Sequence, residues 1–182
     1  MALASVRPPR AVVRLASNPT MEAAGGVWAL LVGIGLLLMG NGLQASLLGV
    51  RAEIEAFGST LTGIVMSGYF VGFLFGSTWT PRAVRRVGHI RVFAGLAALL
   101  AAAALMHPAL GDSLPTVILL RVATGFAIAG LTTVMESWLS ERSTPETRGR
   151  VFAIYLVTTF VAMGSGQLLL NLFPAGDPQA YM

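Results

Sequence analysis

The chain has 182 residues, of which 55% are hydrophobic and only 11% are charged. An ordinary soluble domain carries about 25% charged residues, so a soluble fold of this length could not cover its surface, and lipid is the expected solvent. The formal charge is +4, but the basic residues, all of them arginine, occur in short groups between long apolar runs, a pattern that argues against nucleic-acid binding.

Residues 1–26 are expected to form a cytoplasmic tail. Three arginines stand there among proline, alanine and serine, and no acidic residue comes before Glu22. This composition also fits a transit peptide, and a start at Met21 would leave a short tail of the usual kind. A cleaved signal peptide fits poorly, because the first apolar run is too long and four more follow.

Five apolar stretches follow, each of the roughly 20 residues that a helix needs to cross a bilayer core of about 30 Å. Each is much longer than a buried strand, so α-helix is the expected conformation. The predicted spans are residues 27–50, 61–79, 92–110, 115–139 and 151–173. The fold class is therefore an all-α, polytopic membrane helix bundle over residues 27–173. Residues 174–182 would be an outer tail or the start of a missing loop.

The arginines predict the orientation of the bundle. With the amino terminus inside, the cytoplasmic segments hold ten arginines and the outer loops hold only Arg51, while Arg121 lies within the fourth span. Since cytoplasmic loops are enriched in basic residues, we expect a cytoplasmic amino terminus and an outer carboxyl end. The ten inner arginines are Arg7, Arg10, Arg14, Arg82, Arg85, Arg86, Arg91, Arg142, Arg148 and Arg150.

Glycines at helical spacing are expected to let the helices pack closely, because close packing takes the place of the hydrophobic effect in lipid. Gly68, Gly72 and Gly76 lie on one face of the second span, and Gly125 lies in the fourth. Such surfaces would also let transporter helices slide, although packing alone accounts for most of them.

Polar side chains within spans are costly in hydrocarbon, so they indicate internal contacts or function. Asn41 and Gln44 are three residues apart and share a face of the first span. In the fifth span, Gln167 and Asn171 either line a cavity or link neighbouring helices.

Arg121 and Glu136 both belong to the fourth span, but fifteen residues separate them, about 22 Å of helix rise, so they cannot pair. We expect Arg121 to point into the bundle and meet Asn41 and Gln44, lining a cavity that steers anions or shifts a carrier's proton affinity. The alternative is that Arg121 snorkels outward beside Asp112. Glu136 is expected to pair with an inner arginine.

Enzyme chemistry finds little support. His89 and His107 fall on opposite sides of the predicted membrane, and no group of carboxylates offers an acid–base pair or a metal cage. The chain has no lysine for a phosphate-binding loop and no cysteine for a thiolate nucleophile or a metal site. We therefore expect no enzymatic activity, no cofactor and no bound metal.

The segment between the second and third spans resembles a loop motif of the major facilitator superfamily, Gly-x-x-x-Asp-Arg-x-Gly-Arg-Arg. Arg86 and Gly88 match this motif, whereas Pro81 replaces the first glycine and Arg85 replaces the aspartate. In the family this aspartate joins a charge network that latches the two halves, so Arg85 departs from that network.

Further motifs extend the resemblance. Arg121-x-x-x-Gly125-x-x-x-Ala129 is similar to the family's fourth-helix motif, which has been linked to proton coupling, and residues 140–150 resemble the loop between helices four and five. Glu136-Ser137-Trp138 together with Gly166-Gln167-Leu168-Leu169 resembles the YcaD-type subgroup, in which a basic residue also replaces the loop aspartate.

The resemblance covers residues 27–173 and implies a fold of twelve helices in two halves, each an inverted pair of three-helix repeats. The chain is then expected to be a fragment of the amino-terminal half. The implied function is secondary active transport of a small solute by alternating access, with proton-coupled efflux as a further expectation, in the inner (plasma) membrane of a bacterium. Transport would require the missing carboxyl-terminal half or a partner chain. The alternative is a small membrane subunit or scaffold that docks on a partner.

Two sets of residues are expected to carry this function. The cavity set, expected to line the substrate path, is Asn41, Gln44, Arg121 and Gln167. The gate set, expected at the cytoplasmic surface, is Arg82, Arg85, Arg86, Gly88, Glu136 and Arg148.

Overall fold

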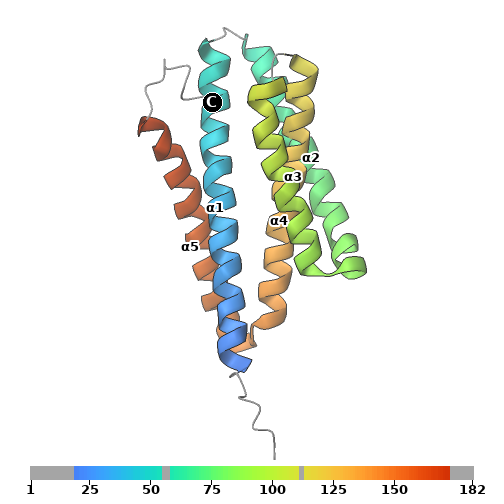
Figure 1. Cartoon of the computed structure of the whole chain (residues 1–182), viewed down its shortest axis with the longest axis vertical. Coiled ribbons are helices and arrows are strands. Elements are labelled where there is room, and N and C mark those ends of the chain that lie inside the picture. The colour runs from blue at the N-terminus through green and yellow to red at the C-terminus, as the bar shows by residue number, and fades with distance from the viewer. Residues whose placement is uncertain (1–18, 55–57, 111–112, 173–182) are drawn as a thin grey trace, which may run out of the picture.

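The computed structural model describes residues 19–54, 58–110 and 113–172. They form the helices α1 (Pro19–Ile54), α2 (Ser59–Val87), α3 (His89–Leu110), α4 (Leu114–Arg142) and α5 (Pro145–Leu169), followed by the 3-10 turn η1 (Leu170–Leu172). All five α-helices are long and apolar enough to cross a membrane, and they run side by side along the long axis of the molecule (Figure 1). The predicted all-α bundle is therefore confirmed. The predicted tails lie mostly outside the described residues.

Several helices extend beyond the apolar stretches that predict them. α1 begins at Pro19, α2 continues through Pro81 to Val87, and α5 begins at Pro145. A hydropathy count ends where the apolar residues end, whereas backbone hydrogen bonding continues into the polar residues that follow. Most of the expected loop between the second and third spans is consequently the last two turns of α2.

Local sequence explains the two connections at the lower end of the bundle in Figure 1. Gly88 alone joins α2 to α3, with φ of +88°, a conformation that glycine adopts without the steric cost that other residues meet. At the start of α5, the backbone N–H of Thr144 donates to Oγ1 of Thr147 at 3.0 Å, with Pro145 in the first turn. We call this the arginine-rich end, because seven arginines lie in or beside these connections: Arg82, Arg85, Arg86, Arg91, Arg142, Arg148 and Arg150.

α2 and α4 pack with their backbones in direct contact. A Cβ atom added to Gly72 would collide with the carbonyl oxygen of Val122, and one added to Gly125 would collide with the carbonyl oxygen of Tyr69. Only glycine fits at these two positions. The expected role of Gly68, Gly72, Gly76 and Gly125 in close packing agrees with this contact.

α1 and α5 repeat the same contact. A Cβ on Gly166 would collide with the carbonyl oxygen of Met39, and one on Gly42 would lie 2.6 Å from that of Met163. In both interfaces each glycine meets the carbonyl three residues before the opposing glycine. Taken in chain order, α1 then corresponds to α4 and α2 to α5. α1 and α4 run in opposite directions (Figure 1), so the two copies of this contact are inverted relative to each other.

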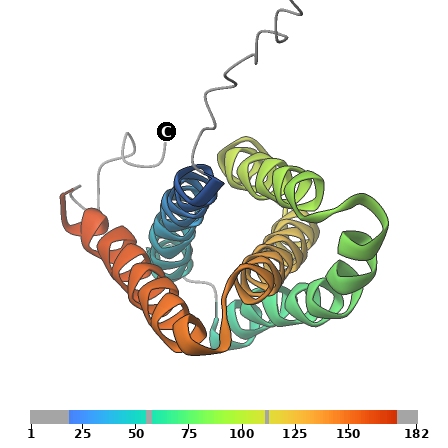
Figure 2. The ribbon, with the colours of Figure 1, turned by 90° about the horizontal axis from the view of Figure 1, so that it is seen from below.

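The helices consequently form two groups, α1 with α5 and α4 with α2 and α3 (Figure 2). The surface between the groups, which we call the seam, is apolar toward the arginine-rich end. There Leu31, Ile34 and Leu38 of α1 belong to one buried cluster with Leu131 and Met135 of α4. The outward faces carry exposed aromatic and aliphatic side chains along α2 and α5, as expected for surfaces solvated by lipid.

Candidate functional site

The face of α1 that lines the seam becomes polar beyond Leu38. Asn41 is 8% exposed, and its Oδ1 has no hydrogen-bond partner among the described residues. One turn further on, Nε2 of Gln44 lies 2.9 Å from Nδ1 of His107 on α3. The outer half of the seam therefore contains a polar contact that joins the two helix groups.

His107 is a seam residue that the sequence analysis did not assign to the site. Its Nδ1 also lies 2.8 Å from the carbonyl oxygen of Ala103, one turn earlier. Because one ring nitrogen carries only one proton, both contacts are met only when Nδ1–H is shared between the Ala103 carbonyl oxygen and a Gln44 amide oxygen turned toward the ring. The sequence feature that could have indicated His107 is its position as a lone histidine near the end of a long alanine-rich span. A polar side chain there requires a partner inside the bundle.

Arg121 is buried within the outer third of α4, only 4% exposed. Its Nη2 lies 3.9 Å from Sδ of Met66, and its guanidinium carbon lies 5.1 Å from the ring centre of Tyr69. Nε and Nη1 have no hydrogen-bond partner among the described residues. The positive charge is thus held against a ring and a thioether, without a described carboxylate.

The expected contacts of Arg121 are only partly formed. The side chain points into the bundle, but its interactions are with α2 rather than with Asn41 and Gln44. Gly68 of α2 lies directly beside this arginine: a Cβ added there would be in ordinary van der Waals contact, 3.6 Å from the Cβ of Arg121. α2 therefore lies close enough to take the guanidinium. Asp112, the alternative outward partner, lies outside the described residues.

Gln167 stands apart from the rest of the cavity set. It is exposed on α5, next to the tightly packed Gly166, and its side chain forms no hydrogen bond with other described residues. The structure therefore joins Gln44 to the other helix group but leaves Gln167 outside this contact.

The gate set lies at the arginine-rich end and is exposed throughout. Arg82 donates to the carbonyl oxygen of Thr78 at 2.6 Å, and Arg148 donates to that of Ser140 at 3.4 Å. Glu136 forms no ion pair with the described residues. It lies instead close enough to Tyr155 of α5 to interact with it electrostatically. The expected ion pair between Glu136 and an inner arginine is therefore not formed among the residues that the structure describes.

A different side chain, His89 on α3, links helices at this end. Its Nε2 lies 3.1 Å from Oγ of Ser137 and 3.5 Å from Oε1 of Glu141, so the start of α3 is tied to the end of α4. Both contacts use the same ring nitrogen, which does not match a relay in which serine and carboxylate meet opposite nitrogens. Sequence reasoning missed this link because 48 residues separate His89 from Ser137.

Comparison with known proteins agrees with this architecture. The family model of the Major Facilitator Superfamily matches residues 27–174. The chain belongs to this superfamily. It is 30% identical over 148 residues to an uncharacterized MFS-type transporter of Enterobacter sp. (strain 638), and 30% identical over 145 residues to the uncharacterized MFS-type transporter YcaD of Escherichia coli strains. No solved structure matches the chain.

The superfamily match makes the chain a multi-pass membrane protein of a transporter family, not an enzyme. The two alignments cover 81% and 80% of the chain but only 38% of each relative. The chain therefore spans well under half the length of these relatives. The resemblance to the superfamily that the sequence motifs predicted is confirmed.

The structure gives the four-residue spacing of Arg121 and Gly125 a physical meaning. Gly125 lies at the backbone contact with Tyr69, and Arg121, one turn earlier, places its guanidinium over the ring of the same tyrosine. Arg121 and Gly125 thus both contact Tyr69 of α2, so the positive charge of Arg121 lies within a tightly packed helix pair.

Proposed function

We propose that the chain is part of a secondary active transporter that moves a small solute by alternating access. Its family and its seam support this proposal. In the twelve-helix fold that the family implies, alternating access moves one half against the other around a path that is blocked toward one side. The backbone contacts of Gly72 with α4 and of Gly166 with α1 hold helices of this half closely together, as the movement of one half as a unit requires.

The observation that carries the proposal is the change of polarity along the seam. Toward the arginine-rich end, Leu38 and Met135 belong to a buried apolar cluster. In the outer half, Asn41 and Gln44 stand on the same helix beyond that cluster, with an unpartnered amide oxygen and a link to α3. An apolar barrier beside polar groups is the arrangement expected for a carrier closed at one end.

Within this proposal the cavity set contacts solute, and Arg121 attracts anions or sets the proton affinity of the carrier. Proton-coupled efflux is the specific form that we propose, because Arg121 and Gly125 resemble the motif linked to coupling. The gate set closes the arginine-rich end, which faces the cytoplasm of a bacterial cell when the protein lies in the inner membrane. Solute, protons and the remaining helices of a full transporter are the implied partners.

Site-directed labelling tests the proposal. The chain has no cysteine, so Asn41→Cys introduces a single reactive thiol into the polar part of the seam. In a carrier this thiol reacts with a membrane-impermeant maleimide added to either side of sealed vesicles, because both orientations are visited. Val157→Cys, on a face that is 63% exposed and expected to meet lipid, is the matched control and stays unlabelled.

With the remaining helices of the transporter present, labelling of Asn41→Cys from only one side, or from neither, would contradict alternating access and favour a docking subunit. A measurement of solute flux then identifies the solute. Vesicles are loaded with a mixture of small metabolites, and mass spectrometry shows which compound exchanges. Imposing a pH gradient in the same assay tests coupling, since a proton antiporter must respond to it and a uniporter must not.

A further inference from the structure

The exposed corner where α2 turns into α3 carries more positive charge than its surroundings balance. Arg85, Arg86 and Arg91 are exposed and form no hydrogen bond or ion pair with the described residues. The acidic residue that His89 contacts there, Glu141, belongs to the end of α4. The guanidinium groups at this corner, which we call the α2–α3 corner, are therefore available for an external anion.

Apolar side chains of the same corner locate it at the edge of the membrane. Trp79 is 50% exposed, and Ile90, beside Arg91, is 74% exposed. Exposed tryptophan is enriched where a bilayer meets water, because its ring is apolar and its N–H is polar. Trp79 and Arg86 are seven residues apart, so they share one face of α2. The charges thus lie at headgroup depth.

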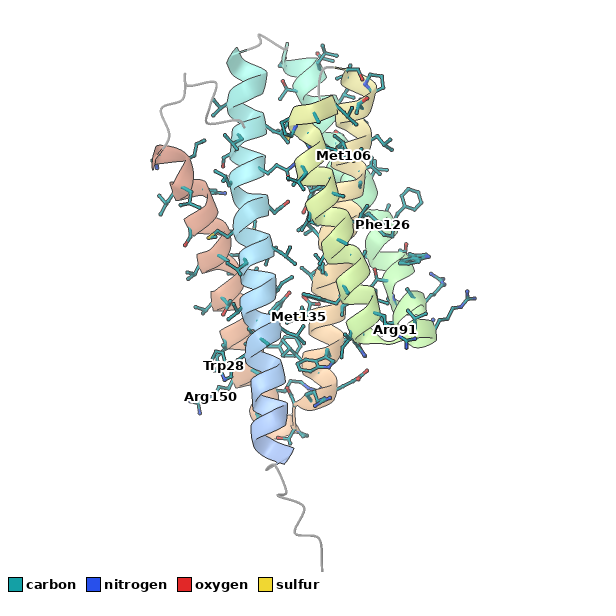
Figure 3. All side chains as sticks on the ribbon, viewed as in Figure 1. Trp28, Arg91, Met106, Phe126, Met135 and Arg150 are labelled. Atoms are coloured by element: carbon teal, nitrogen blue, oxygen red, sulfur yellow. The ribbon has the colours of Figure 1, made fainter. Side chains whose placement is uncertain are left out.

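The corner also lies on the outside of the bundle. Arg91, at the lower end of α3, stands on the opposite side of the molecule from Arg150 at the start of α5 (Figure 3). Trp28, also at this end, is 60% exposed on α1. The α2–α3 corner therefore lies at the outer edge of the bundle, beside the headgroup layer.

We propose that the α2–α3 corner binds the phosphate of an anionic phospholipid, with Arg85, Arg86 and Arg91 around the headgroup and Trp79 and Ile90 against its acyl chains. Clusters of basic residues at a membrane surface attract anionic lipids, and an arginine can hold a phosphate with two parallel hydrogen bonds. The lipid is identified by this chemistry, a phosphodiester without a compensating cationic headgroup. Solute transport is not part of the inference.

Fluorescence quenching by brominated lipid tests this site. A protein with Trp28→Phe and Trp138→Phe keeps Trp79 as its single reporter. It is reconstituted in phosphatidylcholine vesicles containing a minor share of either brominated phosphatidylglycerol or brominated phosphatidylcholine. We expect stronger quenching by the brominated phosphatidylglycerol, and we expect the difference to shrink as salt is raised, because salt screens exposed charges.

Substitutions that remove arginines show which of them cause the preference for phosphatidylglycerol. Each basic residue near an anionic surface contributes about fivefold to binding, so Arg85→Gln with Arg86→Gln should lower the preference by up to about 25-fold, toward the level that Arg91 alone supports. Arg85→Lys with Arg86→Lys should retain most of it. Arg148→Gln with Arg150→Gln removes the same charge from the start of α5 and should leave the preference at Trp79 unchanged.

Two results would overturn the inference: equal quenching by the two brominated lipids, or an equal loss of preference in the α5 control. The first would leave a protein partner as the ligand of these arginines. Native mass spectrometry of the unmodified protein, extracted with both lipids present, gives a second readout that does not depend on the tryptophan substitutions. Retention of phosphatidylglycerol that falls on removal of Arg85 and Arg86 supports the site.

Discussion

At the scale of single residues, Arg121 concentrates the energetic cost of the site. Insertion scales give a guanidinium at a helix centre a cost of about 2.5–3.5 kcal/mol, which on those scales is an upper limit for Arg121 in the outer third of α4, and the ring of Tyr69 offsets about 0.5–2 kcal/mol. Because a charge is costly in hydrocarbon, the burial of Arg121 inside the bundle could be predicted from the sequence. Its partner was not predictable, because helical spacing defines a face but not which neighbouring helix lies nearest. The Gln44–His107 contact joins residues 63 positions apart and was missed for the same reason.

Replacing Arg121 should therefore stabilise the bundle. Arg121→Met keeps a long side chain, removes the uncompensated charge and can pack against Met66 and Tyr69. We expect the free energy of unfolding in mixed micelles to rise by about 1–3 kcal/mol, as found when buried charges are replaced by apolar groups of similar size. Arg86→Met, on the exposed corner, should change it by less than about 0.5 kcal/mol. A destabilised Arg121→Met variant would show that the charge is structurally compensated.

At the scale of helices, apolar length predicted every span, and the structure has each of them. The ends of the helices were less predictable, since α2 continues as helix through Pro81 and its arginines to Val87. Which helices touch was not predicted at all. The sequence shows that Gly72 and Gly125 are small, but the collision of a Cβ with the opposing carbonyl appears only when both helices are present.

Alanine substitutions should separate contact glycines from free ones. In Gly125→Ala the new Cβ collides with the carbonyl oxygen of Tyr69, so the helices must separate. We expect a loss of about 1–3 kcal/mol, the usual cost of overpacking. Gly63→Ala is the control: no atom lies within 4 Å of its Cβ, and alanine favours helix by about 0.5–1 kcal/mol. Equal stabilities for the two variants, measured by unfolding in mixed micelles, would exclude the close contact.

At the scale of the whole molecule, the inverted contact links helices that are far apart in sequence. The offsets differ, because Met39 corresponds to Val122 and Gly72 corresponds to Gly166. A self-comparison of the sequence at one fixed offset would miss this relation. The end of the bundle at which the arginines lie could, in contrast, be predicted without knowing any contact between helices. It depends only on which segments share an end of the bundle.

The orientation of the bundle in the membrane can be tested by labelling. The sequence assigns ten arginines to the predicted cytoplasmic segments and only Arg51 to the predicted outer loops, and a bias of this kind keeps the basic segments in the cytoplasm. Single cysteines at the exposed positions Ser59 and Ser113 should react with a membrane-impermeant maleimide on intact cells. Single cysteines at Val87 and Glu146, exposed at the arginine-rich end, should react only after the membrane is opened. Labelling of Val87→Cys on intact cells would place the arginines outside, and labelling of all four positions would mean that the protein inserts in both directions.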